Sequence, residues 1–190
     1  LAVWHASGVR TISEAKQREL IIGALSRVGT MYGYPALLNA TIGTKFRIVT
    51  GYESAAAVNL AMEKGELQGR GSNPWNAWKA INPQWVAEGK IIPLVQIGLR
   101  KEPELPQTPL LTELAQNDVQ RRMFGFISDA VAVDQPYAAP PGLAPEVGAA
   151  LRAGFKGMFS SGAFVDEARR LGLDLDPIEG ETLASLVTRV

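Results

Sequence analysis

Two runs in the amino-terminal half constrain the fold most strongly. Residues 19–25 read ELIIGAL and residues 46–50 read FRIVT. The first run is nearly continuously apolar, which is typical of a strand covered on both faces, and such strands belong to parallel sheets. Each run leads into a polar corner and then into a segment with helical spacing. The sequence therefore predicts an α/β fold built on a parallel sheet.

The segments between and after these runs complete the strand and helix alternation. Helical spacing covers residues 31–40, where Pro35 must fit near the first turn or kink the helix. A second helix covers residues 53–64 and ends at Gly65, a residue suited to a left-handed helix end. Residues 67–70 are predicted to form a short strand.

The next two elements each contain a proline whose position carries information. Asn73 and Pro74 predict a helix start, with the Asn side chain as cap and Pro at the first helical position. Residues 91–97 (IIPLVQI) predict a strand. Because Pro93 cannot donate a ladder hydrogen bond, this strand is expected at a sheet edge or at a crossing between lobes.

The carboxyl-terminal half has a different character. Residues 101–109 (KEPELPQTP) are rich in proline and predict an extended connector. Residues 110–131 predict one broken helix or two short ones, and residues 132–139 an extended return strand. Helices are predicted from Pro145, around residues 164–171 and from about Glu181, the first with an apolar face of Val147, Ala150, Leu151, Phe155 and Met158.

Composition excludes several classes of function. The chain has 190 residues, of which 46% are hydrophobic and 20% charged, as in ordinary globular proteins. Nineteen basic and nineteen acidic side chains cancel, so nucleic acid is not an expected partner. There is no cysteine, which removes disulfides, thiol nucleophiles and thiolate metal sites. No run approaches the roughly 20 apolar residues that a membrane helix needs.

Catalytic and metal-binding patterns are weak. His5 is the sole histidine, and its spacing suggests no nucleophile with an orienting carboxylate, so a structural or surface role is the better interpretation. One imidazole without clustered carboxylates also predicts no metal site. Asp166 and Glu167 are interpreted as solvated helix residues. The sequence therefore predicts neither an enzyme nor a cofactor or metal.

The corner at residues 26–30 is the first candidate for ligand binding. It follows a buried strand and precedes a helix, so free amides and the positive end of the helix dipole favour an anion there. Ser26 or Thr30 can cap the helix and donate a hydroxyl, and Arg27 can pair with a carboxylate. Plain helix capping with a solvent-facing arginine is the alternative interpretation.

Two further corners follow neighbouring strands. Residues 50–55 and 71–75 should lie near the first corner, because all three follow the carboxyl ends of neighbouring strands. Ligands collect at that edge of an open parallel sheet. Tyr52 is interpreted either as a ligand contact or as a packing residue. The tryptophans at positions 75, 78 and 85 form either an aromatic wall or, more in keeping with their spacing, part of the core.

Four segments, taken in order, resemble the substrate-binding receptors of tripartite tricarboxylate transporters, the Bug family. They are LNATIGTKFRIVTGY, NLAMEKGELQGRGSN, LVQIGLRKEPELPQTPLLTELAQN and YAAPPGLAPEVGAALRAGF, and together they extend over nearly the whole chain. Within them, residues 105–109 match the proline connector of the family and residues 139–142 match its PAPPG-like turn.

The resemblance implies a type II periplasmic-binding-protein fold, here with one complete lobe and part of the second. Residues 18–96 would form lobe 2, and residues 1–17 and 97–190 the hinge and the remaining lobe 1 elements. The implied function is an extracytoplasmic, periplasmic receptor that captures a small carboxylate and presents it to the membrane subunits of the transporter. The implied ligand contacts are Ser26, Arg27, Gly29, Thr30, Tyr52, Ser54, Ala55, Ser72 and Asn73.

Three departures from the family pattern bear on this site. Arg27 and Val28 stand in a loop that is usually richer in glycine, and Ser54 with Ala55 stands where Gly-Ser is frequent. Family members also have a longer amino-terminal part, so the chain is expected to be a fragment. A helical carboxyl-terminal half with an uncovered apolar face then predicts a homo-oligomer.

Two other classes of function compete with the receptor. An effector-binding regulatory domain can share the two-lobe architecture, but no helix-turn-helix segment accompanies it here. A hydrolase or transferase would need a nucleophile with a base, which the lone histidine does not provide.

Overall fold

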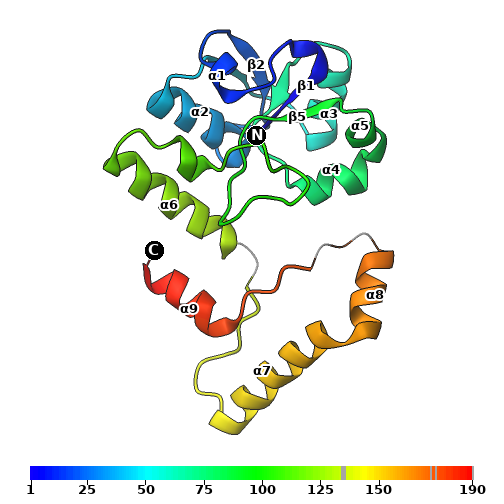
Figure 1. The fold of residues 1–190 in the computed structure, drawn as a ribbon, viewed down its shortest axis with the longest axis vertical. Helices are drawn as coiled ribbons and strands as arrows, with labels where there is room; N and C mark the ends of the chain where they lie inside the picture. Colours follow the sequence, from blue (N-terminus) through cyan, green and yellow to red (C-terminus); the bar gives the residue numbers. More distant parts are fainter. Residues whose placement is uncertain (134–135, 172, 174, 190) are drawn as a thin grey trace. The chain divides into compact units, whose positions relative to one another are not determined.

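The computed structural model describes residues 1–133, 136–171, 173 and 175–189 (Figure 1). The chain divides into two compact units, residues 1–128 and residues 129–190.

The first unit contains a five-stranded sheet with the order β3-β2-β4-β1-β5. The predicted strands are present as β2 (Leu20–Gly23), β3 (Phe46–Val49), β4 (Gly69–Arg70) and β5 (Ile91–Pro93). Strand β2 pairs in parallel with both β3 and β4, which confirms the parallel pairing expected for the run at residues 19–25, although the sheet as a whole is mixed.

Strand β1 (Ala2–Trp4) is not among the predicted elements, because three residues are too few to show a period. It pairs antiparallel with β4 on one side and β5 on the other. Strand β5 therefore lies at the sheet edge, the position expected from Pro93. It ends at Pro93, so it is shorter than the predicted run of residues 91–97, and Gln96 forms only an isolated bridge with Leu110. The assignment of residues 18–96 to one lobe stays a prediction, and residues 2–4 lie in the same sheet as that segment.

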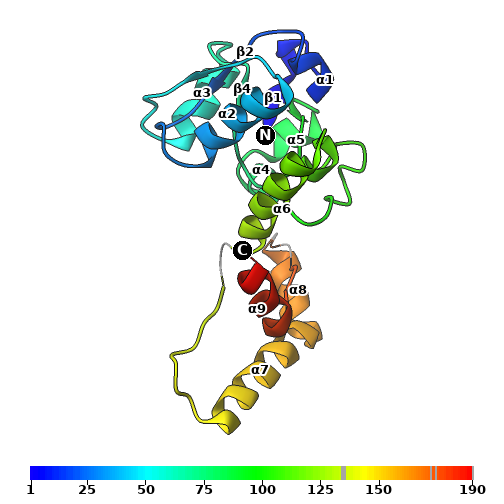
Figure 2. The same cartoon turned by 90° about the vertical axis from the view of Figure 1, so that its left-hand side faces the viewer.

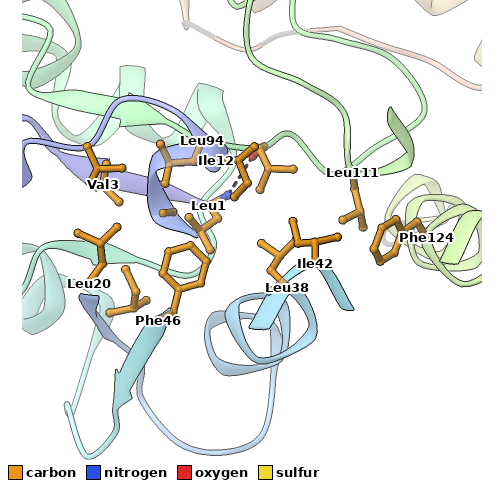
Figure 3. Close-up of a cluster of buried hydrophobic side chains, with 14 residues drawn as sticks. Leu1, Val3, Ile12, Leu20, Leu38, Ile42, Phe46, Leu94, Leu111 and Phe124 are labelled. Carbon is orange, nitrogen blue, oxygen red and sulfur yellow. Dashed lines mark hydrogen bonds between the residues drawn. The ribbon is translucent and has the colours of Figure 1, made fainter. Parts of the chain in front are cut away.

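Helices cover both faces of the sheet. Helix α2 (Thr30–Ile42) packs into a core with Leu20, Phe46, Leu94 and Phe124, the last from helix α6 (Asp118–Ala132) (Figure 3). Helix α3 (Ala55–Glu63) packs into a second core with Trp4, Leu67 and Trp78. The remaining short helices of this region are η1 (His5–Ser7), α1 (Ile12–Ala15), α4 (Trp75–Ile81), α5 (Pro83–Ala87) and η2 (Leu111–Leu114).

The predicted start of the helix after β4 is shifted by one residue. Helix α4 begins at Trp75, so Pro74 is the flanking residue rather than the first helical one, and no side chain caps this start. The prediction that Asn73 caps the helix is wrong. Pro74 has extended backbone angles (φ −59°, ψ 147°), which places it outside the helix.

The tryptophans pack in the core, in agreement with the interpretation that their spacing favours. Trp78 is 2% exposed, and Trp85 lies between Trp4 and Trp78, with ring centroids 4.8 and 6.2 Å away. Trp75 is half-buried and donates through Nε1 to Glu104 Oε2 at 2.8 Å. Hydrogen bonds from Lys79 and then Trp75 hold the pKa of Glu104 below its usual value.

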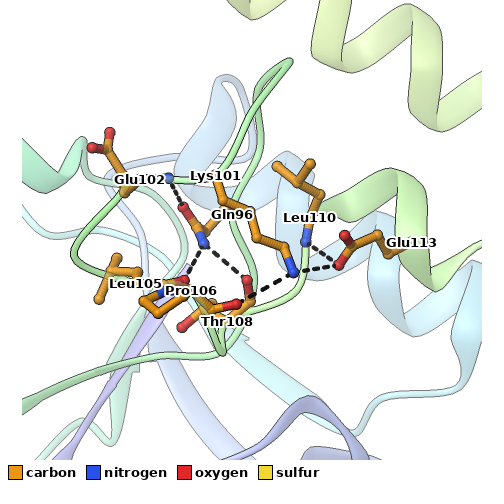
Figure 4. Close-up of polar contacts among 8 residues, drawn as sticks. All are labelled: Gln96, Lys101, Glu102, Leu105, Pro106, Thr108, Leu110 and Glu113. Atoms are coloured by element: carbon orange, nitrogen blue, oxygen red, sulfur yellow. Dashed lines mark hydrogen bonds and ion pairs between the residues drawn. The ribbon is translucent and has the colours of Figure 1, made fainter.

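Residues 101–109 are folded back on themselves, and the prediction of an extended connector is wrong. Gln96 is the reason (Figure 4). Its Nε2 donates to the carbonyl oxygens of Leu105 and Thr108 at 2.9 and 2.8 Å, and its Oε1 accepts from the Glu102 amide at 2.8 Å. The Leu105 and Thr108 amides also donate within the segment, to the carbonyl oxygens of Glu102 and Leu105. Because the three prolines lack an N–H, the Gln96 side chain adds hydrogen bonds that the backbone alone does not supply.

Helix α6 (Asp118–Ala132) carries the chain out of the first unit, and with η2 it confirms the prediction of two short helices. Phe124 is fully buried, and Gln120 Nε2 donates to the Thr41 carbonyl oxygen of α2 at 2.6 Å. The first half of α6 therefore lies beside α2.

The second unit contains the three predicted helices, α7 (Pro145–Ser160), α8 (Gly162–Arg170) and α9 (Gly180–Arg189). Helices α7 and α8 meet at an angle at Ser161 (Figures 1 and 2). Of the predicted return strand at residues 132–139, residues 134 and 135 lie outside the described residues, and residues 136–139 form no strand. Among the helices described, none is both long and apolar enough to cross a bilayer.

Replacing Gln96 with leucine should release residues 101–109. The change removes three hydrogen bonds and leaves two carbonyl oxygens and one amide without their partner, which we expect to cost about 2 kcal/mol of unfolding free energy. Limited proteolysis should cut this segment faster than in the parental protein, whereas the exposed Gln107→Leu control should leave the cleavage rate unchanged. Equal cleavage in Gln96→Leu and the control would contradict this role of Gln96.

Candidate functional site

The strand order indicates that a ligand site belongs at the carboxyl ends of β2 and β4. Strand β2 lies between β3 and β4, so the chain moves to one side through α2 and back across through α3. Because parallel crossovers are right-handed, the two helices must cover opposite faces, as their separate cores show. The strand order therefore reverses beside β2, which is where open α/β sheets bind ligands.

The first and third corners meet at this point. Thr30 Oγ1 lies 2.8 Å from Ser72 Oγ, a hydrogen bond between residues 42 positions apart in sequence. Both side chains come from the predicted site, and both reach the carboxyl-terminal edge of the sheet. The structure thus brings together two of the three predicted corners through a direct side-chain contact.

Close backbone contact holds the third corner against α2. A Cβ atom on Gly71 would lie 1.9 Å from the Met31 carbonyl oxygen and 3.0 Å from Pro35 Cδ. Pro35 lies inside α2 and has no N–H, so the Met31 carbonyl lacks its usual helical donor. Glycine at position 71 lets the chain pass directly over that carbonyl.

The start of α2 carries no side-chain cap, so the prediction that Ser26 or Thr30 caps it is wrong. The Ser26 hydroxyl instead donates to the Val28 carbonyl at 3.0 Å and accepts from the Val28 amide at 3.2 Å, while Thr30 is bound to Ser72. The flanking residue Gly29 has φ 96°, which favours glycine. The amides of the first turn therefore face outward without a capping side chain, as an anion site requires.

The second corner joins the first through the backbone and caps α3. The Gly51 amide donates to the Leu25 carbonyl at 3.0 Å. Ser54 caps α3 by accepting from the Ala57 amide at 3.1 Å, which leaves its own hydroxyl hydrogen available to a ligand. Ala55 is the half-buried first residue of α3. Tyr52 is partly buried against the core of α3, in agreement with the packing interpretation.

The remaining two predicted residues differ in exposure. Arg27 is exposed and forms no ion pair with any residue that the structure describes, and Asn73 is half-buried beside Ser72. In the described part of the chain there is no cluster of three or more residues with metal-binding side chains. The corners therefore offer amides, hydroxyls and one long cationic side chain rather than a metal centre.

An open hollow of about 330 Å³ lies beside the start of α2, near the lower end of the roughly 300–1,000 Å³ typical of small-molecule sites. Its lining is almost wholly apolar apart from two hydroxyls, and consists of Gly29, Thr30, Gly33, Tyr34, Leu37 and Ile127. Residues 33 and 37 follow Gly29 at helical spacing, so they were within reach of sequence reasoning. Ile127 comes from α6, and no local pattern links it to this place.

The contact at Gly71 gives a direct test of how the corners are held. Gly71→Ala should force the third corner away from α2 and lower the unfolding free energy by about 2 kcal/mol, the cost typical of overpacking. Gly125→Ala in α6 is the matched control, because nothing lies within 4 Å of the position its Cβ would take and alanine favours a helix. Denaturant titration of both variants checks the difference, and equal stability of Gly71→Ala and the parental protein would contradict the close contact.

Comparison with known proteins gives a likeness of fold. No family model matches the sequence, and no curated protein matches it significantly. Among solved structures, the chain is similar to the ligand-free crystal structure of a TctC solute-binding protein from Polaromonas, with a TM-score of 0.68 and 18% sequence identity. The match covers 99% of this chain and 61% of the Polaromonas chain. This likeness confirms the predicted α/β fold of the periplasmic-binding-protein type.

Proposed function

We propose that the chain is the solute-binding part of an extracytoplasmic receptor that captures a small carboxylate. The observation that carries the proposal is the Thr30 to Ser72 hydrogen bond at the reversal point of the strand order, beside the uncapped start of α2. The shared fold with a TctC solute-binding protein supports it. Delivery to the membrane subunits of a tripartite tricarboxylate transporter, and a periplasmic location, belong to the same proposal.

The ligand carboxylate would lie at the first turn of α2. There the amides and the positive end of the helix dipole favour negative charge. The Ser54 hydroxyl can donate to the ligand, and so can one hydroxyl of the hydrogen-bonded pair Thr30 and Ser72, because the other donates within the pair. The Arg27 side chain, in the exposed corner before α2, is long enough to donate a charged hydrogen bond to the ligand carboxylate. The apolar hollow next to Thr30 would receive the hydrocarbon part of the solute.

Capture without turnover is the mechanism that this arrangement supports. His5 is exposed in η1 and has the Trp4 ring as its aromatic neighbour at 5.1 Å, well separated in sequence from the three corners. A ligand that gains contacts in a closed state shifts the receptor toward that state by its difference in affinity for the two states. In the proposal, residues 18–96 supply one side of the closed site.

Removing single hydroxyls should weaken carboxylate binding. Thr30→Ala and Ser54→Ala should each raise the Kd of the best carboxylate from a panel about tenfold, the worth of one hydrogen bond to a charged group. Both variants should stay folded, although Ser54→Ala also loses a helix cap worth about 1 kcal/mol. Calorimetric titration of the full-length protein measures the Kd, and product analysis of the same mixtures shows whether any solute is consumed.

Ser13→Ala is the matched control for these hydroxyls. Ser13 is exposed in α1, which precedes β2, so it belongs to the opposite edge of the sheet from the corners. Its replacement should leave the Kd unchanged. Unchanged affinity in both Thr30→Ala and Ser54→Ala would remove these residues from the site.

The apolar face of α7 leads us to propose that the isolated chain self-associates. No residue of α7 is buried, and Val147, Leu151 and Phe155, spaced four residues apart, are 43, 55 and 40% exposed. A second copy of the chain would cover this face, because contiguous apolar surface rarely stays in water. Light scattering at micromolar concentration should give a mass above that of the monomer, and Leu151→Glu should reduce it. A monomeric mass for the parental chain would contradict the proposal.

A further inference from the structure

Arg70 is a buried cation without a counter-ion among the described residues. It is 7% exposed, and its Nη1 donates to Asn59 Oδ1 at 3.1 Å. Its Nε is buried without a hydrogen-bond partner, and no ion pair joins Arg70 to any residue that the structure describes. One amide oxygen therefore serves a group with five N–H donors, in a place that water barely reaches.

The surroundings of Arg70 do not neutralise its charge. The guanidinium carbon lies 5.4 Å from the ring centroid of Trp78, and Asn59 in turn donates to Asn82 Oδ1 at 3.3 Å. A tryptophan ring attracts a cation only through its quadrupole, and an asparagine only through its dipole. These contacts hold the side chain in place but carry no net negative charge.

This arrangement costs stability in the absence of a ligand. Burial lowers the pKa of Arg70 to about 10, so the side chain stays charged at neutral pH. A buried charge without a partner is unfavourable, and apolar residues of similar size often replace such groups without loss of stability. The charge of Arg70 therefore does not serve the stability of the fold. It would serve a site that binds anions.

Arg70 also adjoins the candidate site along the chain. It is the last residue of β4 and directly precedes Gly71 and Ser72, the corner that contacts Thr30. We infer that Arg70 is the fixed positive charge by which the candidate site selects anionic solutes over neutral ones of the same shape. The inference rests on the proposed function of that site. Arg70 acts as a positioning residue, through its field behind the corners rather than by contact with the solute.

Matched pairs of acids and amides test the charge directly. The probes are succinate with succinamide and nicotinate with nicotinamide, titrated calorimetrically into full-length parental, Arg70→Met and Arg70→Lys proteins. Arg70→Met should raise the Kd of the preferred acid about tenfold, which is the effect of one nearby, partly buried charge, and should leave the Kd of the matching amide unchanged. Arg70→Lys should restore the preference for the acid.

The outcomes separate this inference from the proposed function. Equal preference for the acid in parental and Arg70→Met proteins would overturn the inference alone. Binding of no carboxylate by the folded parental protein would contradict the proposed function and the inference together. The double variant Arg70→Met/Asn59→Leu replaces both partners by apolar groups and should unfold at the parental temperature or above it. Clear destabilisation of this variant would show that the fold needs the charge, and would overturn the inference.

Discussion

The structure depends on one constraint, the burial of β2 between two parallel neighbours. Leu20 and Ile22 are fully buried, and both edges of the strand are hydrogen-bonded, to β3 and to β4. Because strand–helix–strand crossovers are right-handed, the chain can reach β3 and β4, on opposite sides of β2, only with α2 on one face of the sheet and α3 on the other. The two cores and the meeting of three corners at one sheet edge follow from this single placement.

The same edge shows where stability has not been maximised. The start of α2 has no capping side chain, and the Met31 carbonyl lacks a helical donor because Pro35 has no N–H. Arg70 lies buried without a counter-ion in the part of the chain that the structure describes. Some groups of the same kind are satisfied elsewhere, by Ser54 at the start of α3 and by Gln96 in the turn at residues 101–109, whereas α4 also starts without a side-chain cap. Local departures from otherwise consistent chemistry are expected where a protein binds a ligand.

The sequence predicted the parallel strands and their helices because these signals are local. The apolar run at residues 19–25, the helix end at Gly65 and the edge proline at position 93 each act within a few residues. Strand β1, the turn around Gln96 and the place of Ile127 depend on partners far along the chain. No pattern within a window of the sequence could reveal them, and the same holds for the Thr30 to Ser72 bond.

The central claim is that carboxylates bind where the three corners meet. Backbone amide NMR of the isotopically labelled protein, titrated with the best carboxylate of the panel, tests it most directly. We expect saturable shifts concentrated at Thr30, Met31, Ala55 and Ser72, because the ligand would contact the amides of those turns. Saturable shifts confined to residues outside the three corners would contradict it.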